Sequence, residues 1–442
     1  MARLKRIRQE LLAGLFVALA AALLWTTPAP ASEPGEAPAA VESLDSLVRT
    51  AFENNPGIAA ARARWQASVE RYPQAKALPD PVFGVTYFPS PVETRLGPNR
   101  KQFKLNQMLP GFGKLKLKGK KAGKAAETAR LKYEIAVRDV VTDVKISHAE
   151  LQYLQEAIVL TQKNKILVER LLKLAERDYA GRKASFQDLM RTQSQLAQVT
   201  YDLLLIEEIR RTEETRINSL LGRPPEDAVA VSGQANVKVP TLGVEELYAT
   251  AEKHRHEILL ADVETEISHL SLGLAKRRSK PDFDLGVVYS SIGEAANPTM
   301  KDSGKDAWGI MLGVTLPVWF TKNRSAVREA EYGVQAAQSS RRDVINATNS
   351  MIKNLFFKIR TSARLVELYE KTLIPQARKS LELSETWYEG GRASLAEMLE
   401  TQAVWLNFEL ALARARADLI QNLARLEQAV GYPLTGERGK EQ

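Results

Sequence analysis

The sequence predicts a mainly α-helical chain that is internally duplicated and that also contains four short β-strands. Three observations support this fold class. From about residue 115 to residue 179 there is no proline, and the middle of the stretch spaces apolar residues alternately by four and three. A second stretch of this kind begins near residue 322, about 210 residues after the first. Two pairs of short segments instead alternate apolar and polar residues with the period of a strand.

The first 31 residues have the composition of a secretory signal peptide. Basic residues precede an apolar run from Leu11 to Trp25, and Ala29-Pro30-Ala31 offers small residues for cleavage. An uncleaved membrane anchor is the alternative, although about fifteen apolar residues are short for a bilayer. We therefore expect an exported chain, with residues 32–43 as a flexible leader rich in Pro, Ala and Glu.

The amino-acid composition excludes several kinds of chemical site. Without cysteine it can form no disulfide, thiolate site or lipidated cysteine. The formal charge of +9 falls to about +6 without the signal peptide, and basic and acidic residues alternate along helices, so we expect no nucleic-acid partner. No catalytic triad, phosphate loop or metal-ligand spacing is present, which predicts a non-enzyme without cofactor or metal. His254-Arg255-His256-Glu257 is the one candidate metal cluster, and a solvated helix start is favoured there.

The first repeat is expected to span residues 44–223. A short helix from Leu44 ends before Pro56, and a second runs from Gly57 to about Leu78. A β-hairpin follows over about residues 82–109, after which Pro110 and Gly111 turn the chain into the long helix of residues 115–179. A return helix covers about residues 185–221.

The turn between the long helix and the return helix has its own signals. Gly181 stands where a left-handed helix cap is wanted, next to Arg182, and Ser185 stands where an N-cap is wanted. At about 1.5 Å per residue, the long helix would extend for roughly 100 Å. Such a helix must lie along others, so we expect the second short helix and the return helix to be stacked end to end beside it.

The second repeat is expected over residues 244–433, after a polar linker at 224–243 and before a tail at 434–442. Its hairpin spans about residues 283–316, its long helix about 322–388 and its return helix about 394–430. Pro317 corresponds to Pro110, and Gly391 and Ser394 belong to the second tip. A duplication with matching proline breaks and matching tips is a specific signal.

Four strands cannot close a barrel, and an open sheet edge cannot face lipid. If three copies pool their strands, the total of about twelve falls within the range of outer-membrane barrels. Aromatic residues are concentrated in and beside the strands, as interfacial girdles would require; they are Phe83, Tyr87, Phe88, Phe103, Tyr289, Trp308 and Trp319. The alternative is a small soluble β-layer whose aromatic residues form a core.

The order of these motifs resembles that of the TolC-like outer-membrane efflux proteins. The motifs include Pro79-Asp80-Pro81, the Leu109-Pro110-Gly111-Phe112-Gly113 strand exit, the Thr315-Leu316-Pro317 turn, the paired Gly-x-Ala-Ser tips and the repeated Gly-x-Pro ending. The resemblance implies a homotrimer with a twelve-stranded barrel in outer-membrane lipid and a long α-barrel crossing the periplasm. It also implies docking to a periplasmic adaptor and an inner-membrane pump. A soluble periplasmic adaptor or coiled-coil scaffold is the alternative function.

Candidate site residues lie around the two tips. Glu397 and Glu400 are one helical turn apart and would form carboxylate rings when repeated threefold; ordinary solvated glutamates are the alternative. Asp188 and Arg191 occupy the matching places in the first repeat and are candidates for pairing with neighbouring tips.

The resemblance further matches Tyr388 to a tyrosine of the family's gate. The gate's basic residue falls on Ala393, with Arg392 one position earlier, so the latch of this chain departs from the family pattern. We expect exposed tip residues to contact the adaptor; they are Gly181, Arg182, Ser185, Gly391, Arg392 and Ser394.

Overall fold

The computed structural model describes residues 41–182, 184–231, 243–297, 299 and 301–434. The chain divides into two compact units after Val41, and apart from Val41 the elements discussed below belong to the second unit, which starts at Glu42. The predicted signal peptide, nearly all of the leader, most of the linker and nearly all of the C-terminal tail lie outside the described residues.

Two short strands, β1 (Val41–Glu42) and β4 (Ala230–Val231), flank the first repeat, whose long strands are β2 (Val82–Thr94) and β3 (Gly97–Leu109). Its helices are α2 (Leu44–Asn54), α3 (Pro56–Val69), α4 (Arg71–Lys76), α5 (Lys114–Ala180) and α6 (Phe186–Leu221). Pro56 separates α2 from α3, and the Asn55 side chain caps α3 by accepting from the N–H groups of Gly57 and Ile58. The second short helix of the prediction is thus two helices, with a break at Glu70.

The second repeat contains β5 (Phe283–Ile292) and β6 (Ala307–Val314). Its helices are α7 (Val244–His254), α8 (His256–Arg278), α9 (Phe320–Leu368), α10 (Ile374–Glu389) and α11 (Leu395–Val430). The single helix predicted over residues 322–388 is interrupted, because a π-helical turn, η1 (Tyr369–Leu373), separates α9 from α10. Pro375 explains the interruption, since it has no N–H and its ring would clash with the carbonyl of Lys371 in a regular α-helix. The 67-residue α5 contains no proline and stays regular.

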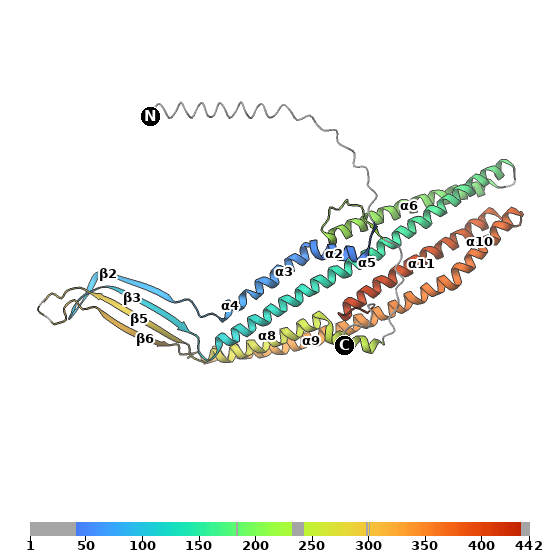
Figure 1. The fold of residues 1–442 in the computed structure, drawn as a ribbon. Coiled ribbons are helices and arrows are strands. Elements are labelled where there is room, and N and C mark those ends of the chain that lie inside the picture. The colour runs from blue at the N-terminus through green and yellow to red at the C-terminus, as the bar shows by residue number, and fades with distance from the viewer. Residues whose placement is uncertain (1–40, 183, 232–242, 298, 300, 435–442) are drawn as a thin grey trace, which may run out of the picture. The chain divides into compact units, whose positions relative to one another are not determined.

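Helix α5 is the central element of the helical layer. It packs against α2, α3, α4 and α6 on one side and against α8 and α11 on the other, while α9 packs against α8 and α11 (Figure 1). Two cores hold the repeats: one groups Leu47, Val144, Leu151 and Ile217, and the other groups Leu247, Ile352, Leu423 and Leu426. Helix by helix, the described part of the chain contains no segment with the length and hydrophobicity of a bilayer-spanning helix.

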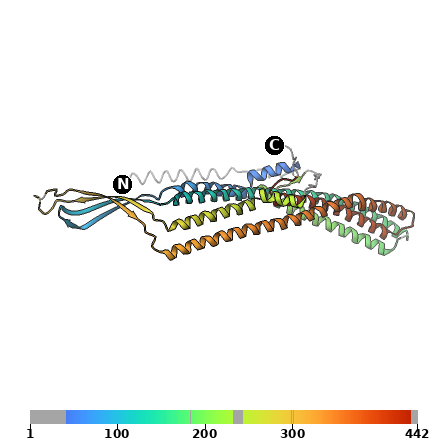
Figure 2. The same cartoon turned by 90° about the horizontal axis from the view of Figure 1, so that it is seen from below.

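The two hairpins form one antiparallel sheet with the strand order β2-β3-β5-β6. The pairing of β3 with β5 joins the repeats, with Leu105 opposite Val287 and Phe103 opposite Tyr289. Within the described residues, β2 and β6 each keep one unpaired edge. The strands lie at one end of the helical layer, and the α5–α6 and α10–α11 turns lie at the other (Figure 2).

Candidate functional site

One face of the sheet carries continuous rows of apolar side chains. The first row is Val85, Phe103, Tyr289 and Trp308, and the second is Phe83, Leu105, Val287 and Ile310. Apart from the half-buried Phe103, these side chains are exposed: Trp308 is 74% exposed and Ile310 is 70% exposed. The rings of Phe83 and Phe103 are 6.4 Å apart, and those of Phe103 and Tyr289 are 6.2 Å apart. Within the described residues, these aromatic side chains therefore do not form the core that the soluble-layer alternative required.

The opposite face of the sheet is more polar and carries no aromatic side chain in its paired rows. Those rows are Val82, Asn106, Gly286 and Met311; Gly84, Lys104, Val288 and Gly309; and Thr86, Gln102, Ser290 and Ala307. A sheet with one apolar, aromatic face and a more polar opposite face is the pattern of membrane barrels, in which side chains alternate between lipid and lumen. Tyr87 lies on β2, as predicted, and is 63% exposed, whereas Trp319 lies outside the sheet in the turn before α9.

The junction between strands and helices is organised by Asp282, a residue that sequence reasoning did not single out. Its carboxylate accepts from the Gly111 N–H and from Lys114 Nζ, both at 2.8 Å. Gly111 must be glycine, because a Cβ there would lie 2.5 Å from the Pro281 carbonyl oxygen. On the second side, the Thr315 N–H donates to the Asp282 carbonyl oxygen at 2.9 Å. The sequence signal that could have identified Asp282 is its position as an acidic residue between Pro281 and the first residue of β5.

The predicted junction prolines flank this arrangement. Pro110 is half-buried next to Gly111, and the Pro317 carbonyl accepts from the Asn323 side chain at 3.4 Å. Both prolines follow a strand and precede a long helix, where they prevent the ladder from continuing.

The two tips are built alike, on capping boxes. The Ser185 N–H donates to the Asp188 carboxylate at 3.1 Å, and the Asp188 N–H donates back to Ser185 Oγ at 3.1 Å. In the second tip, the Ser394 N–H donates to Glu397 at 2.9 Å, and the Glu397 N–H donates to Ser394 Oγ at 3.2 Å. Asp188 and Glu397 thus have a local role, because their carboxylates accept hydrogen bonds from the backbone N–H groups of the N-cap serines of α6 and α11.

Backbone geometry at the tips differs from the prediction at one position. Gly181 is not left-handed, since its φ is −80°. The left-handed residues are Arg182, with φ of 56°, and its counterpart Gly391, with φ of 70°. The chain needs the left-handed turn one residue later than the sequence suggested, because the Arg182 N–H closes a turn on the Tyr179 carbonyl at 3.0 Å.

The other tip residues are placed on the surface. Arg191 and Glu400 are exposed on the second turns of α6 and α11, each three residues beyond the capping acid of its own tip. Arg392 is also exposed, and its backbone N–H donates to the Trp387 carbonyl at 2.8 Å. Gly181, Arg182, Ser185, Gly391 and Ser394 are all exposed.

Tyr388 connects the two helical hairpins, which are α5 with α6 and α10 with α11. Its hydroxyl donates to the Asp178 carboxylate at 2.9 Å, from the end of α10 to the end of α5. Burial and the hydrogen bond to Asp178 together raise the pKa of Tyr388 to about 12. The tyrosine packs on a small core shared by α5 and α11, which contains Leu171, Ala175, Leu395, Met398 and Leu399.

Further polar contacts continue along α5 and α11, away from the tips. Gln402 bonds Asn164 in a buried position. Arg414 makes bonds of 2.7 and 2.9 Å to Glu150, and Lys145 bonds Glu427 at 2.6 Å. The α5–α11 interface between the two helical hairpins is therefore polar along much of its length, whereas each repeat has an apolar core.

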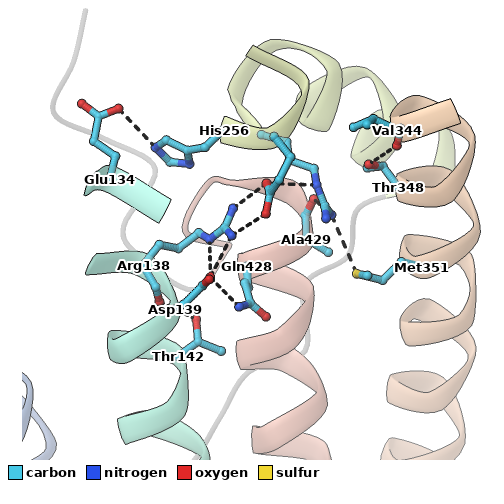
Figure 3. Close-up of polar contacts among 12 residues, drawn as sticks. Glu134, Arg138, Asp139, Thr142, His256, Val344, Thr348, Met351, Gln428 and Ala429 are labelled. Carbon is cyan, nitrogen blue, oxygen red and sulfur yellow. Dashed lines mark hydrogen bonds and ion pairs between the residues drawn. The ribbon is translucent and has the colours of Figure 1, made fainter. Parts of the chain in front are cut away.

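A cluster around Arg138 ties α5 to α8 and α11 (Figure 3). Arg138 donates hydrogen bonds of 2.8 and 2.6 Å to Glu257 and of 3.1 and 2.8 Å to Asp139. Burial alone would raise the pKa of Glu257, but the Arg138 guanidinium outweighs it and lowers that pKa. His256 lies 3.8 Å from Glu134, and burial lowers the pKa of this histidine.

The predicted solvated helix start at residues 254–257 is thus wrong in detail, because His256 and Glu257 are half-buried in an ion-pair cluster. In the described ranges, no group of three or more His, Asp or Glu side chains is placed to hold a metal ion.

Comparisons with known proteins agree with this geometry. A family described as "Outer membrane efflux protein" matches residues 47–223 and again residues 247–432. The outer membrane protein TolC of Vibrio cholerae is 22% identical over 318 residues, which cover 70% of this chain and 72% of TolC. The pyoverdine export outer membrane protein OpmQ of Pseudomonas putida is 21% identical, with 88% of this chain and 85% of OpmQ covered. The crystal structure of VceC from Vibrio cholerae has a TM-score of 0.75 at 20% identity, with 88% of this chain and 96% of VceC covered. Because the family matches both halves of the chain, this protein belongs to the outer membrane efflux protein family.

Proposed function

We propose that this chain is the outer-membrane channel of a tripartite efflux pump. Three copies join their sheets into a twelve-stranded barrel in the outer membrane and their helices into an α-barrel that crosses the periplasm. Substrates pass from the periplasm to the exterior through this tunnel, and the tips at its periplasmic end meet an adaptor protein that links the channel to an inner-membrane pump.

The observation that carries this proposal is the four-stranded sheet with one exposed apolar face and two unpaired edges. Exposed edges of this kind invite pairing with another chain, and in lipid every backbone N–H and C=O must be paired. Pairing β6 of one copy with β2 of the next removes all edges when the ring closes. Strands of 13, 13, 10 and 8 residues bracket the ~9–11 residues of a tilted membrane strand.

The helical layer also has exposed apolar side chains along two of its margins, on α6 and on α10. On α6, Tyr201 and Leu204 are 60% and 59% exposed; on α10, Trp387 and Leu383 are 51% and 47% exposed. An apolar strip on each margin suits a ring in which α6 of one copy meets α10 of its neighbour. The same cyclic contact would serve the sheet and the helices.

The gate of the proposed channel lies at the tips. Within one copy, the Tyr388–Asp178 bond and the small core beneath it hold the two hairpins together. We propose that opening separates the hairpins along the polar α5–α11 interface, because polar contacts exchange with water at lower cost than an apolar core. Glu397 and Glu400 are exposed beside this link and would line the constriction when repeated around the ring.

The test is to express the mature chain, fractionate membranes and compare heated and unheated samples by gel mobility, followed by single-channel recording. A heat-modifiable trimer that conducts supports the proposal. A soluble, non-conducting monomer contradicts it and favours a periplasmic adaptor or scaffold.

The carboxylate rings have a separate test. Replacing Glu400 with Gln should reduce the preference for cations in planar bilayers, because the side chain is exposed and makes no bond within the described chain that the change would break. Glu397→Gln should also reduce it while retaining the cap, since an amide oxygen can accept from the Ser394 N–H. Glu264→Gln on α8, away from the tips, is the matched control. Unchanged selectivity in both tip variants removes these residues from the pore lining.

A further inference from the structure

The helix ends next to the sheet carry an unusual concentration of positive charge. The first turns of α5 contain lysines at positions 114, 116, 118, 120, 121 and 124 with no carboxylate among them. Helix α8 ends in Lys276, Arg277 and Arg278, followed by Lys280, and α9 begins with Lys322, Arg324 and Arg328. Cations in the first turns of α5 and α9 oppose the helix dipole, so they do not serve the stability of those helices.

These segments meet in space. Lys114 Nζ donates to the Lys280 carbonyl at 2.7 Å, which brings the start of α5 to the end of α8. Ser279, just after α8, lines a hollow of about 680 Å³ together with Arg324 and Arg328 of α9. We call the exposed basic residues of this region the basic collar; they are Lys116, Lys118, Lys120, Lys276, Arg278, Lys280, Lys322, Arg324 and Arg328.

The positive charge of the collar is largely uncompensated within the chain. Lys114 is paired with Asp282 at 2.8 Å, and Lys124 is paired with Glu127 and Glu266 at 2.9 and 2.7 Å. No member of the basic collar forms an ion pair with any residue that the structure describes. Glu331 is the one acidic residue that lines the hollow.

The α5 part of the collar presents a lysine on the outer side of the helical layer whichever side faces the tunnel. Gly119 faces Lys76 and Tyr72 of α4, and Leu117 faces Gly273 of α8, so these contacts define the two covered sides of α5. At about 100° per residue, Lys118 projects from one uncovered side and Lys116 from the opposite one. An outward lysine is therefore present in either orientation.

Large apolar side chains stand among these cations. Leu316 and Trp319, in the turn between β6 and α9, and Phe320, the first residue of α9, are 70%, 73% and 75% exposed. Leu316 and Phe320 line the same hollow as Arg324 and Arg328. Tryptophan and other apolar groups beside Lys and Arg, directly below membrane strands, are the combination found at the level of lipid headgroups.

We propose that the basic collar binds the headgroups of anionic phospholipids in the leaflet nearest the helices, with Arg324 and Arg328 on the phosphate and Leu316 and Phe320 on the adjoining apolar part of the lipid. This inference rests on the proposed insertion of the strands in a membrane. It assigns a lipid-binding function to charge that neither the fold nor the gate uses.

The test compares lipid binding by the full-length mature trimer and two variants, using native mass spectrometry with phosphatidylglycerol and phosphatidylcholine of identical chains. The collar variant is K116Q/K118Q/R324Q/R328Q, which removes charge from both uncovered sides of α5. The control variant is K163Q/K165Q/R170Q/K173Q, which removes equal charge from α5 far from the sheet. Since each basic residue near a charged surface contributes up to about a fivefold effect, we expect the collar variant to lose at least about tenfold of its preference for phosphatidylglycerol.

Several results would overturn the proposal. The wild type could bind both lipids equally, or the control variant could lose as much preference as the collar variant. Inorganic phosphate that displaces phosphatidylglycerol at equal concentration would indicate a small-anion site instead. Co-sedimentation with purified peptidoglycan that only the collar variant loses, without a lipid preference, would assign the collar to that polymer.

Conductance in neutral phosphatidylcholine bilayers separates this inference from the proposed function. A chain that conducts there but has no preference for phosphatidylglycerol refutes the lipid site and leaves the channel intact. A chain that neither trimerises nor conducts refutes both.

Discussion

The link between Tyr388 and Asp178 allows the proposed gate to be tested with the loss of one oxygen atom. Tyr388→Phe removes the hydroxyl that donates to Asp178 at 2.9 Å and keeps the ring on its small core. A hydrogen bond to a charged group contributes about 1.5–3 kcal/mol. Tyr388 is only half-buried, so we discount this to about 1 kcal/mol per copy.

The threefold ring multiplies the effect. If all three links break on opening, the closed state loses about 3 kcal/mol, which corresponds to roughly a hundredfold rise in the ratio of open to closed channels. The assay is the open fraction of single channels in planar bilayers. Because the pKa of Tyr388 is raised to about 12, the hydroxyl stays protonated at neutral pH, and the effect should be constant between about pH 6 and 9.

The first repeat supplies a matched control. Tyr179 stands in the corresponding place, is 45% exposed and contacts the Phe186 ring at 5.8 Å. Tyr179→Phe should leave the open fraction unchanged. Asp178→Asn combined with Tyr388→Phe should give less than the sum of the single effects, since both changes remove the same bond. An open fraction in Tyr388→Phe equal to that of the wild type would refute the reasoning.

Three further predictions concern stability. Gly111→Ala should lower the free energy of unfolding by about 1–3 kcal/mol, because its Cβ would clash with the Pro281 carbonyl at 2.5 Å; thermal unfolding measures this. Arg182→Gly should stabilise the first tip by about 1 kcal/mol, because φ is 56° there, as denaturant unfolding would show. Burial lowers the pKa of His256, so the unfolded chain binds the proton more readily and stability should fall as the pH drops below the ordinary value of 6.5; His256→Gln should flatten that dependence in unfolding scans at several pH values.

Each of these predictions has a control within the chain. Gly84→Ala meets no atom within 4 Å and should cost much less than Gly111→Ala. Arg182→Ala keeps a Cβ in the left-handed region, so a gain equal to that of Arg182→Gly would contradict the backbone explanation. His269→Gln changes a histidine outside the Arg138 cluster, and a slope that His269 controls as strongly as His256 would contradict the assignment.

Local sequence signals identified the strands, the long helices and their duplication, but not the breaks at Glu70 and at Tyr369–Leu373. Alternation with a period of two identified the strands. The apolar stripe spaced by four and three between residues 115 and 179 includes Val144, Leu151 and Leu154, which are buried in the structure. The serine N-caps at both tips follow from local turn chemistry, which acts over a few residues. The left-handed residue was predicted at Gly181 but lies one position later, at Arg182, because nothing in the sequence marks an arginine as left-handed.

What the tertiary structure decided involves partners far apart in the chain. The pairing of β3 with β5, the central place of Asp282 at the junction and the bond from Tyr388 to Asp178 each join residues more than 150 positions apart. Helical and strand periods state which side of an element is apolar, but they contain no information about which other element covers it. The sequence by itself therefore determined the repeated helices, strands and tips, whereas the hydrogen bonds that lock the two repeats together depend on the packing of complete elements against one another.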